Sequence, residues 1–262
     1  MGSATTQARA ATTAALGAAS SIDLDVAREL FVAARTLGES SQLSGALADS
    51  SAAPGARAQV VSHVFGTYGP TTVSLLSAAA QQRWSSASDL IDGIEELGIR
   101  AAAIAEPSAD IEGELFEVLR TIAANPELEL ALGSRLGDAT AKGTLIESLL
   151  RGRTSAPTML IVSSAVQQPR ERRVRQLIGR AMRLVAQQRG RSVATVIAAK
   201  PLSAPQAERL TAALSQRYGT EISLNVVVDP SVVGGVRVEI ADDVIDASVS
   251  SRLHDLRQKL AG

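Results

Sequence analysis

The chain repeats part of itself at an interval of 85 positions. Residues 25–37 (DVARELFVAARTL) align with residues 110–122 (DIEGELFEVLRTI), with six identical positions of thirteen and three conservative apolar exchanges. After a one-residue insertion, Gln81–Gln82 align with Gln167–Gln168. Abundant alanine inflates such matches, but Glu-Leu-Phe, Arg-Thr and Gln-Gln contain none. Self-similarity at a fixed period indicates a module present more than once, so the sequence predicts two copies of one fold.

Each copy has the apolar spacing of a helical bundle. Ile111, Leu115, Val118 and Ile122 follow the i, i+4, i+7, i+11 pattern of one helix face. Aromatic residues make up only 2% of the chain, so we expect a core of Ala, Leu, Val and Ile in closely packed helices. Short breaks rich in Gly, Pro and Asn separate these helices.

The segment 88–105 has two assignments. It closes the first copy and opens the second, so the two bundles are expected to share it or to meet there. We therefore predict a first helical bundle in residues 1–105 and a second in residues 88–190, with the segment 88–105 in common.

From residue 191 the pattern changes from helical to strand-like. After a first strand, Ser203 and Gln206 predict a capping box for a helix that ends at Gly219. The alternation over 222–228 predicts another strand. With two further short strands and a last helix, residues 191–262 are predicted to form a small βαββα-type domain. The expected fold class is α+β, mainly α: tandem N-terminal helical bundles followed by this domain.

A glycine pair lies between the last strands of this domain. Residues 228–240 read VDPSVVGGVRVEI, and IDAS follows at 245–248. Glycine adopts positive φ without a steric penalty, so we interpret Gly234 and Gly235 as a hairpin or bulge pair. The pair does not precede a helix, and an anion site is therefore not expected there.

These residues carry a family resemblance. The chain resembles the delta subunit of F-type ATP synthases, whose mitochondrial counterpart is the oligomycin-sensitivity-conferring protein, in an enlarged form of actinobacterial type. The family has V-D-P, a G-G pair, I-D-x-S and a leucine-spaced final helix. The matching residues are Asp229, Pro230, Gly234, Gly235, Asp246 and Ser248, with Leu253, Leu256 and Leu260 in the final helix. Where the family more often has glycine this chain has Ala247, which disfavours a left-handed turn.

The resemblance implies a non-catalytic stator subunit. Such a subunit grips the N-terminal segments of the alpha subunits on the catalytic head and ties them to the b-type stalk subunits, so that proton-driven rotation is coupled to ATP synthesis. The second bundle would be the family-typical N-terminal domain, and the first an extra copy. The resemblance implies no cofactor, no metal, no direct nucleotide and no nucleic acid. It places the protein peripherally at the cytoplasmic face of the plasma membrane, through the complex.

Residues that carry catalysis are scarce. The chain has no cysteine, which excludes disulfides and thiolate chemistry. Its two histidines, His63 and His254, fall in different modules. Asp246, Ser248 and His254 could be imagined as a catalytic trio, but we interpret Ser248 as a helix N-cap and His254 as a polar-face residue. The segment 137–144 resembles a phosphate-binding loop only loosely, because its lysine precedes the second glycine and no strand leads into it.

No targeting or membrane segment is predicted. Residues 1–20 lack the basic start and leucine-rich centre of a signal peptide. The longest strongly apolar run, 159–162, is far shorter than the roughly 20 residues that span a bilayer. We expect a soluble protein that meets the membrane only through partners.

The strongest charge feature is an arginine segment. Between residues 170 and 191 lie eight arginines and one acid, Glu171, although the whole chain has a net charge of −1. A solvated helix face is the default interpretation, and a basic dock for an acidic partner helix is the next. The alternative function is a nucleic-acid-associated helical adaptor, which lacks accompanying aromatics for base stacking. The candidate partner-binding residues are Arg172, Arg173, Arg175, Arg180 and Arg183.

Alanine-lined grooves of a bundle can also accept a partner helix. Leu75, Leu76, Ile161 and Val162 line either such a groove or the core, and the core is expected because large apolar residues are most often buried.

Overall fold

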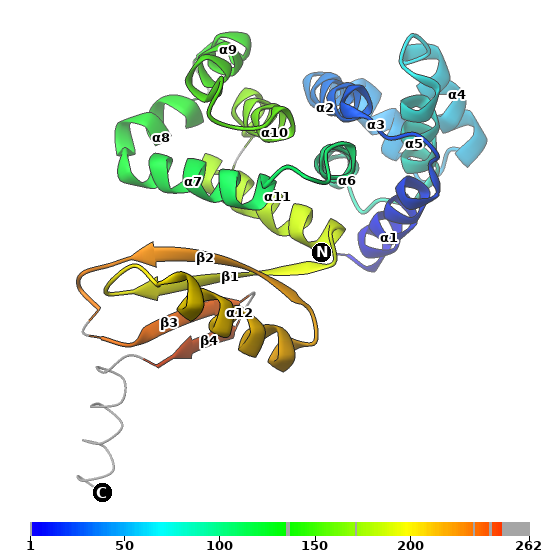
Figure 1. Cartoon of the computed structure of the whole chain (residues 1–262). Helices are drawn as coiled ribbons and strands as arrows, with labels where there is room; N and C mark the ends of the chain where they lie inside the picture. Colours follow the sequence, from blue (N-terminus) through cyan, green and yellow to red (C-terminus); the bar gives the residue numbers. More distant parts are fainter. Residues whose placement is uncertain (1, 135–136, 171, 233, 241–242, 248–262) are drawn as a thin grey trace, which may run out of the picture. The chain divides into compact units, whose positions relative to one another are not determined.

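The computed structural model describes residues 2–134, 137–170, 172–232, 234–240 and 243–247. The chain divides into two compact units, a helical unit (residues 1–184) and a C-terminal unit (residues 185–262), each described by itself. In chain order (Figure 1) the elements are α1 (Ser3–Ala18), α2 (Leu24–Glu39), α3 (Ser41–Ala48), α4 (Pro54–Val64), α5 (Pro70–Gln81), α6 (Ala87–Ala105), α7 (Ile111–Ala124), α8 (Pro126–Gly133), α9 (Ala139–Leu150), α10 (Ala156–Gln167), α11 (Val174–Gln188), β1 (Arg191–Ala198), α12 (Ala204–Tyr218), β2 (Glu221–Val228), β3 (Val236–Ile240) and β4 (Asp243–Asp246).

The helix bounds recur at the interval found in the sequence. α3 corresponds to α8, α4 to α9 and α5 to α10, with equal or nearly equal lengths. The order from α2 to α6 is thereby repeated from α7 to α11 (Figure 1). The predicted duplication is therefore present in the helices as well as in the residues.

The two copies share an internal hydrogen-bond arrangement. In α2, both carboxylate oxygens of Glu29 accept from the backbone N–H of Gly69, directly before α5, at 3.1 and 3.0 Å. In α7, both oxygens of Glu114 accept from the backbone N–H of Ser155, directly before α10, at 3.0 Å. A carboxylate at a helix N-terminus pairs an otherwise unsatisfied donor and interacts favourably with the helix dipole. The same device therefore fixes the start of α5 and the start of α10.

Helix α6 contacts helices of both copies. It packs against α1, α2, α3 and α5, and also against α10. Twelve of its nineteen residues are buried, as expected for a helix enclosed on several sides. These contacts give a physical basis to the double assignment of 88–105. The division of the helical unit into bundles 1–105 and 88–190 stays a prediction.

Two glycines of α6 allow aromatic rings to approach its backbone. A Cβ atom at Gly93 would lie 2.2 Å from the ring of Trp84, and one at Gly98 would lie 3.1 Å from the ring of Phe31. Trp84 is the single tryptophan of the chain. It is buried, and its Nε1–H donates to the carbonyl oxygen of Ala79 at 2.8 Å. Both rings therefore occupy space that a side chain at position 93 or 98 would fill.

The described strands of the C-terminal unit form a mixed sheet in the order β2-β1-β3-β4. β1 pairs with β2 in parallel and with β3 antiparallel, and β3 pairs with β4 antiparallel. Parallel neighbours need a crossover connection, which α12 supplies as it packs against β2. The core of this unit consists of Ala194, Val196, Leu214, Ile222, Val238 and Ile240.

The local predictions for this unit have mixed outcomes. The capping box of Ser203 and Gln206 is present, and Gly219 ends α12 with a φ of 68°. Gly234 and Gly235 have positive φ values of 70° and 77°. The hairpin interpretation of this pair is wrong, because β1 lies between β2 and β3 in the sheet. The predicted last helix lies outside the described residues.

Within the described part of the chain, no helix combines the length and the apolar character needed to cross a bilayer.

Candidate functional site

The first part of the arginine segment lies against acids of α6. Nη2 of Arg170 forms ion pairs with Asp92 and with Glu95, the latter at 2.9 Å. Nη2 of Arg172 lies 3.2 Å from Asp92 and 3.0 Å from Glu95. These four side chains hold the segment before α11 onto α6.

A second ion-pair group surrounds Glu96, whose side chain is only 9% exposed. Its carboxylate accepts from Nη2 of Arg100 at 2.8 Å and from Nη2 of Arg180 at 3.3 Å. Nη1 of Arg9 lies 3.7 Å away. A buried charge is tolerated only when it is paired and hydrogen-bonded. Glu96 therefore connects α1, α6 and α11.

Burial shifts the protonation equilibria of these groups. Burial raises the pKa of Glu95, although the neighbouring Arg172 lowers it. Burial, followed by the charges of Arg172 and Arg180, lowers the pKa of Arg170 to about 10. A guanidinium with this pKa stays charged at neutral pH. Arg170 therefore keeps its positive charge beside Asp92 and Glu95.

The other candidate arginines differ in their surroundings. Nε of Arg175 lies 2.9 Å from Glu129 of α8. Arg173 and Arg183 are exposed, and no carboxylate of the described residues lies within ion-pair distance of either. Of the five candidates, Arg172, Arg175 and Arg180 are thus paired inside the molecule, whereas Arg173 and Arg183 keep uncompensated charge.

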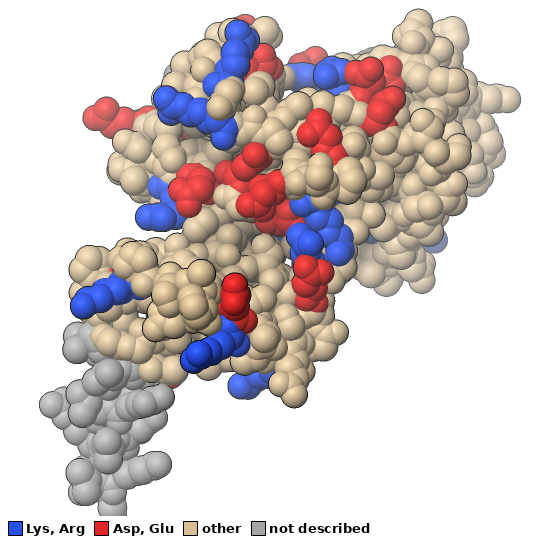
Figure 2. All heavy atoms as spheres, viewed as in Figure 1, with Lys and Arg blue, Asp and Glu red and all other residues tan. Residues whose placement is uncertain are grey.

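Charge on the visible face of the helical unit is mixed. In Figure 2, Lys and Arg side chains and Asp and Glu side chains form neighbouring groups over the helices. A surface that binds nucleic acid concentrates basic residues in a stripe or patch. The face shown has no such stripe.

The residues of the C-terminal signature shape the connection after β2. The backbone N–H of Asp229 donates to the carbonyl oxygen of Ala198 at 2.9 Å, and its carboxylate accepts from the backbone N–H of Ser231 at 2.9 Å. The hydrogen bonds from Ser231 lower the pKa of Asp229. Pro230 follows on the surface, and Asp246 ends β4 opposite Arg237. The hydrogen bonds of Asp229 therefore hold the backbone of this connection in place.

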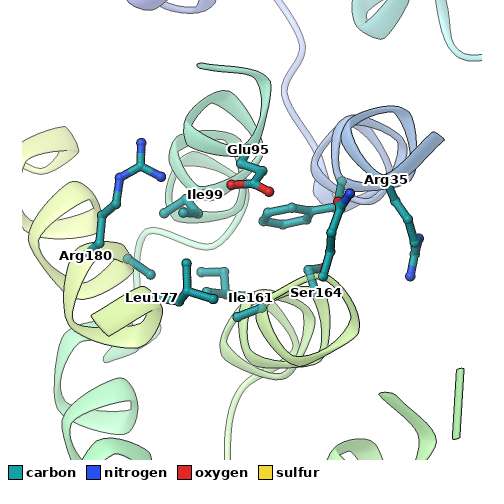
Figure 3. A pocket seen from close by; sticks show the side chains of 11 residues that line it. Arg35, Glu95, Ile99, Ile161, Ser164, Leu177 and Arg180 are labelled. Atoms are coloured by element: carbon teal, nitrogen blue, oxygen red, sulfur yellow. The ribbon is translucent and has the colours of Figure 1, made fainter. Parts of the chain in front are cut away.

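A small pocket lies where α2, α6, α10 and α11 meet. In Figure 3, Ile99, Ile161 and Leu177 turn toward one another, and Glu95 lies beside them. The pocket measures about 40 Å³, which is room for a few water molecules. It has the size of a packing gap between helices of the two copies.

A larger open groove lies between the end of α1 and the start of α5, and we call it the α1–α5 groove. It measures about 500 Å³. Its lining contains no charged side chain and consists of Ala15, Ala18, Ala19, Ser20, Pro70, Thr71, Ser74 and Leu75. Such small residues let another helix approach closely, and apolar grooves of this kind accept amphipathic helices.

Sequence reasoning named only Leu75 of this lining. Leu76 and Val162 are core residues, 1% and 0% exposed, and Ile161 is buried beside the small pocket. The signal that could have located the groove is the run of alanines at the end of α1, where the helix face would otherwise carry larger side chains.

At three of the eight lining positions the second copy has a bulkier residue. By the repeat alignment, three small residues of the groove, Ala15, Ala19 and Ser74, correspond to Arg100, Ile104 and Leu160. The Arg100 side chain is bound to Glu96 inside the molecule. The small-residue lining is therefore a property of the first copy.

Metal-ligating residues do not gather in the described ranges. Among those residues, no group of three or more His, Asp and Glu could hold a metal ion. His63 is exposed on α4. Ser248 and His254 lie outside the described residues.

Known proteins similar to this chain have a common description. A family model described as ATP synthase delta (OSCP) subunit matches residues 99–260. An ATP synthase subunit delta from Leifsonia xyli subsp. xyli is 48% identical over 264 residues and covers 100% of both chains. Another, from Streptomyces avermitilis, is 38% identical over 254 residues and covers 94% of this chain and 93% of the relative.

A solved structure is also similar to this chain. It is a chain of the Toxoplasma gondii mitochondrial ATP synthase hexamer, with a TM-score of 0.38 and 22% identity, covering 63% of this chain and 97% of that chain. This score is too low to support a comparison of folds.

Proposed function

The chain belongs to the ATP synthase delta (OSCP) subunit family, and we propose that it is a non-catalytic stator subunit of an F-type proton-translocating ATP synthase. In this role it links the alpha subunits of the catalytic head to the b-type peripheral stalk, so that proton-driven rotation is coupled to ATP synthesis. The membership confirms the resemblance carried by the motif around Asp229 and Gly234.

The observation that carries the proposal is the full-length match to the Leifsonia xyli protein. Identity of 48% extends over both complete chains, so it includes the extra helical copy as well as the C-terminal unit. A relative of the same enlarged form supports one assembly role for the whole chain.

We place one contact with an alpha subunit in the α1–α5 groove of the extra copy, in addition to the contact that the family-typical second bundle is expected to make. The N-terminal segment of an alpha subunit would bind there as an amphipathic helix. The uncharged lining and the volume of about 500 Å³ support this placement, since apolar helix faces bind in grooves of small and apolar residues.

The contact with the b-type stalk subunits belongs to the C-terminal unit in this proposal. Its support is the family signature in that unit, and the family model covers it up to residue 260. Through these contacts the protein would lie peripherally at the cytoplasmic face of the plasma membrane, within the complex.

Two arginines of the predicted set are proposed to contact partners. Arg173 and Arg183 are exposed and lack an acidic neighbour among the described residues. Arg172, Arg175 and Arg180 have intramolecular acids as partners, and we assign them to holding α11 in place.

The stator role is tested by reconstitution. The full-length chain is added to an F-type ATP synthase preparation from which the delta subunit has been removed. We expect the chain to co-purify with alpha and b-type subunits and to restore ATP synthesis driven by a proton gradient. If the chain binds neither the alpha nor the b-type subunits, the stator role is excluded.

The role of the α1–α5 groove is tested by replacing two of its small residues with their counterparts from the second copy. A double variant, Ala19→Ile with Ser74→Leu, narrows the groove, and a labelled peptide with the alpha N-terminal sequence is titrated against the full-length chain. We expect binding about 10-fold weaker, which corresponds to about 1.4 kcal/mol. Ala10→Ile, on the exposed part of α1 outside the groove, is the control and leaves the affinity unchanged. Equal affinities for all three proteins would place the peptide elsewhere.

A further inference from the structure

Two open pockets of the helical unit adjoin each other. One, of about 520 Å³, lies between α8 and the start of α11, and the other, of about 380 Å³, lies between the ends of α2 and α10 and the start of α9. They share Ser134 and Arg170 in their linings. We call the combined surface the basic trough, since five basic residues line it, Arg35, Lys142, Arg170, Arg172 and Arg173.

The charge of the basic trough is only partly compensated. Arg170 and Arg172 are paired with acids of α6. The exposed Arg173 and the half-buried Arg35 have no carboxylate of the described residues within ion-pair distance.

The two acids in the lining of the trough offset only part of this positive charge. Of its two acidic lining residues, Glu39 and Glu129, the second is bound by Arg175. Lys142 donates to the carbonyl oxygen of Ser134, and no carboxylate of the described residues lies within ion-pair distance of its ammonium group. The surface therefore attracts an anionic partner.

Arg170 has a backbone conformation that non-glycine residues seldom adopt. Its φ is 52°, the one positive value outside glycine among the described residues. This conformation is strained and persists only where the surroundings enforce it. The ion pairs of Arg170 with Asp92 and Glu95 supply that enforcement. The strained residue thus stands, rigidly held, on the wall common to both pockets.

An apolar side chain stands at the edge of the basic trough. Leu130 of α8 is 76% exposed and lines the larger pocket with Pro126 and Val174. A single exposed leucine needs no special explanation. Beside Arg35, Lys142 and Arg173, which have no acidic partner within the described ranges, it offers an apolar contact to a partner that also carries acids.

We propose that the basic trough binds an acidic amphipathic helix of another polypeptide. Carboxylates of that helix pair with Arg35 and Arg173, and an apolar residue packs on Leu130. The stator assignment gives Arg173 a partner contact without saying what kind of partner it is, and the present proposal states that chemistry for the whole trough. A polypeptide fits better than a nucleic acid, because none of the described residues lining the two pockets is aromatic and base stacking is the usual apolar component of single-strand binding.

The first test measures binding by the full-length protein. The probe is a labelled synthetic amphipathic helix of about 18 residues, with Glu on one face and Leu on the other, followed by fluorescence anisotropy. Comparison probes are the same peptide with Gln in place of Glu and a single-stranded oligonucleotide. We expect the Glu peptide to bind at least 10-fold more tightly than either, with an affinity that falls as salt rises. Equal binding of the Gln peptide, or preference for the oligonucleotide, overturns the proposal.

The second test locates the site with charge reversals. Arg35→Glu and Arg173→Glu are each expected to weaken Glu-peptide binding about 10-fold. Arg151→Glu is the matched control. Arg151 is exposed like Arg173, lies in the helical unit outside both pockets, and has no acidic partner among the described residues. It should change the affinity less than about 2-fold. An equal loss of affinity in the control would show that the effect depends only on the net charge of the protein, and would contradict the proposal.

The third test separates the apolar contact from the ionic ones. Leu130→Ser, on the exposed surface, is expected to weaken binding about 5-fold without changing its salt dependence, whereas Arg173→Glu reduces that dependence. Circular dichroism confirms that each variant is folded. A Leu130→Ser protein with unchanged affinity would exclude the amphipathic mode of binding.

Discussion

Among single residues, Gly93 is held to glycine by its contact with the ring of Trp84. The indole nitrogen is bonded to the carbonyl of Ala79, so the ring cannot move away from α6 without losing a buried hydrogen bond. A methyl group at position 93 would stand 2.2 Å from that ring. Space, and not backbone conformation, therefore demands glycine here.

We predict that Gly93→Ala destabilises the helical unit by about 1–3 kcal/mol through overpacking. Urea unfolding, followed by Trp84 fluorescence and by circular dichroism, measures the change. Gly45→Ala in α3 is the control, because a Cβ atom there meets nothing within 4 Å. It should stabilise by about 0.5–1 kcal/mol through helix propensity. A Gly93→Ala protein as stable as the unaltered one would show that the indole can relocate.

Residue-scale prediction from the sequence succeeds where the interaction is local. The capping box at Ser203 involves residues three positions apart, and periodicity suffices to place it. The partners of Arg170 on α6 are more than 70 residues away. Nothing in the spacing of the arginines marks Asp92 or Glu95 as their counter-ions, because that pairing follows from how α6 and α11 pack.

Between elements, the two copies use the same carboxylate to position equivalent helices. Glu29 holds the start of α5, and Glu114 holds the start of α10. We predict that Glu29→Ala and Glu114→Ala each lower the free energy of unfolding by about 1–2 kcal/mol. The two losses should be similar and additive, since the sites share no partner.

Chemical denaturation of both single variants and of the double variant measures these losses. Glu39→Ala, an exposed residue at the end of α2 without a hydrogen-bond or ion-pair partner among the described residues, is the control. It should stay within about 0.5 kcal/mol of the unaltered protein. A large loss of stability for only one of the two variants would mean that the repeated hydrogen bond does not stabilise both copies equally.

Prediction of elements from the sequence is reliable for helices and fails for strand pairing. The copies, their breaks and the small C-terminal domain follow from periodicity and turn residues. Gly234 and Gly235 suggest a hairpin, but the strands around them are separated by β1. Positive φ values permit many connections, and the choice among them depends on α12 bringing β2 beside β1. The α1–α5 groove escaped prediction because alanines fit a core and a groove equally well.

For the whole molecule, the two units have separate cores. The helical unit buries Leu30 and its neighbours, and the C-terminal unit buries Leu214 with five other residues. We predict that Leu214→Ala costs about 2–5 kcal/mol in the C-terminal unit. Its thermal transition should fall by about 10 °C or more, while the helical unit melts unchanged.

The single tryptophan distinguishes the two transitions. Trp84 lies in the helical unit, so its fluorescence follows that unit alone, whereas calorimetry records both. Leu30→Ala is the reciprocal variant and should lower the fluorescence transition. If Leu214→Ala shifted the Trp84 signal as much as Leu30→Ala does, the units would unfold as one.

The packing of α6 against helices that precede it and against α10 restricts how such a chain can change during evolution. Deleting residues 1–86 would expose the apolar surface of α6 that contacts α1, α2, α3 and α5, and deleting residues 106–184 would expose the surface that contacts α10. Either deletion would therefore leave buried residues of α6 in contact with water. The enlarged form is therefore expected to persist in its lineage or to shrink only with compensating changes along the surface of that one helix.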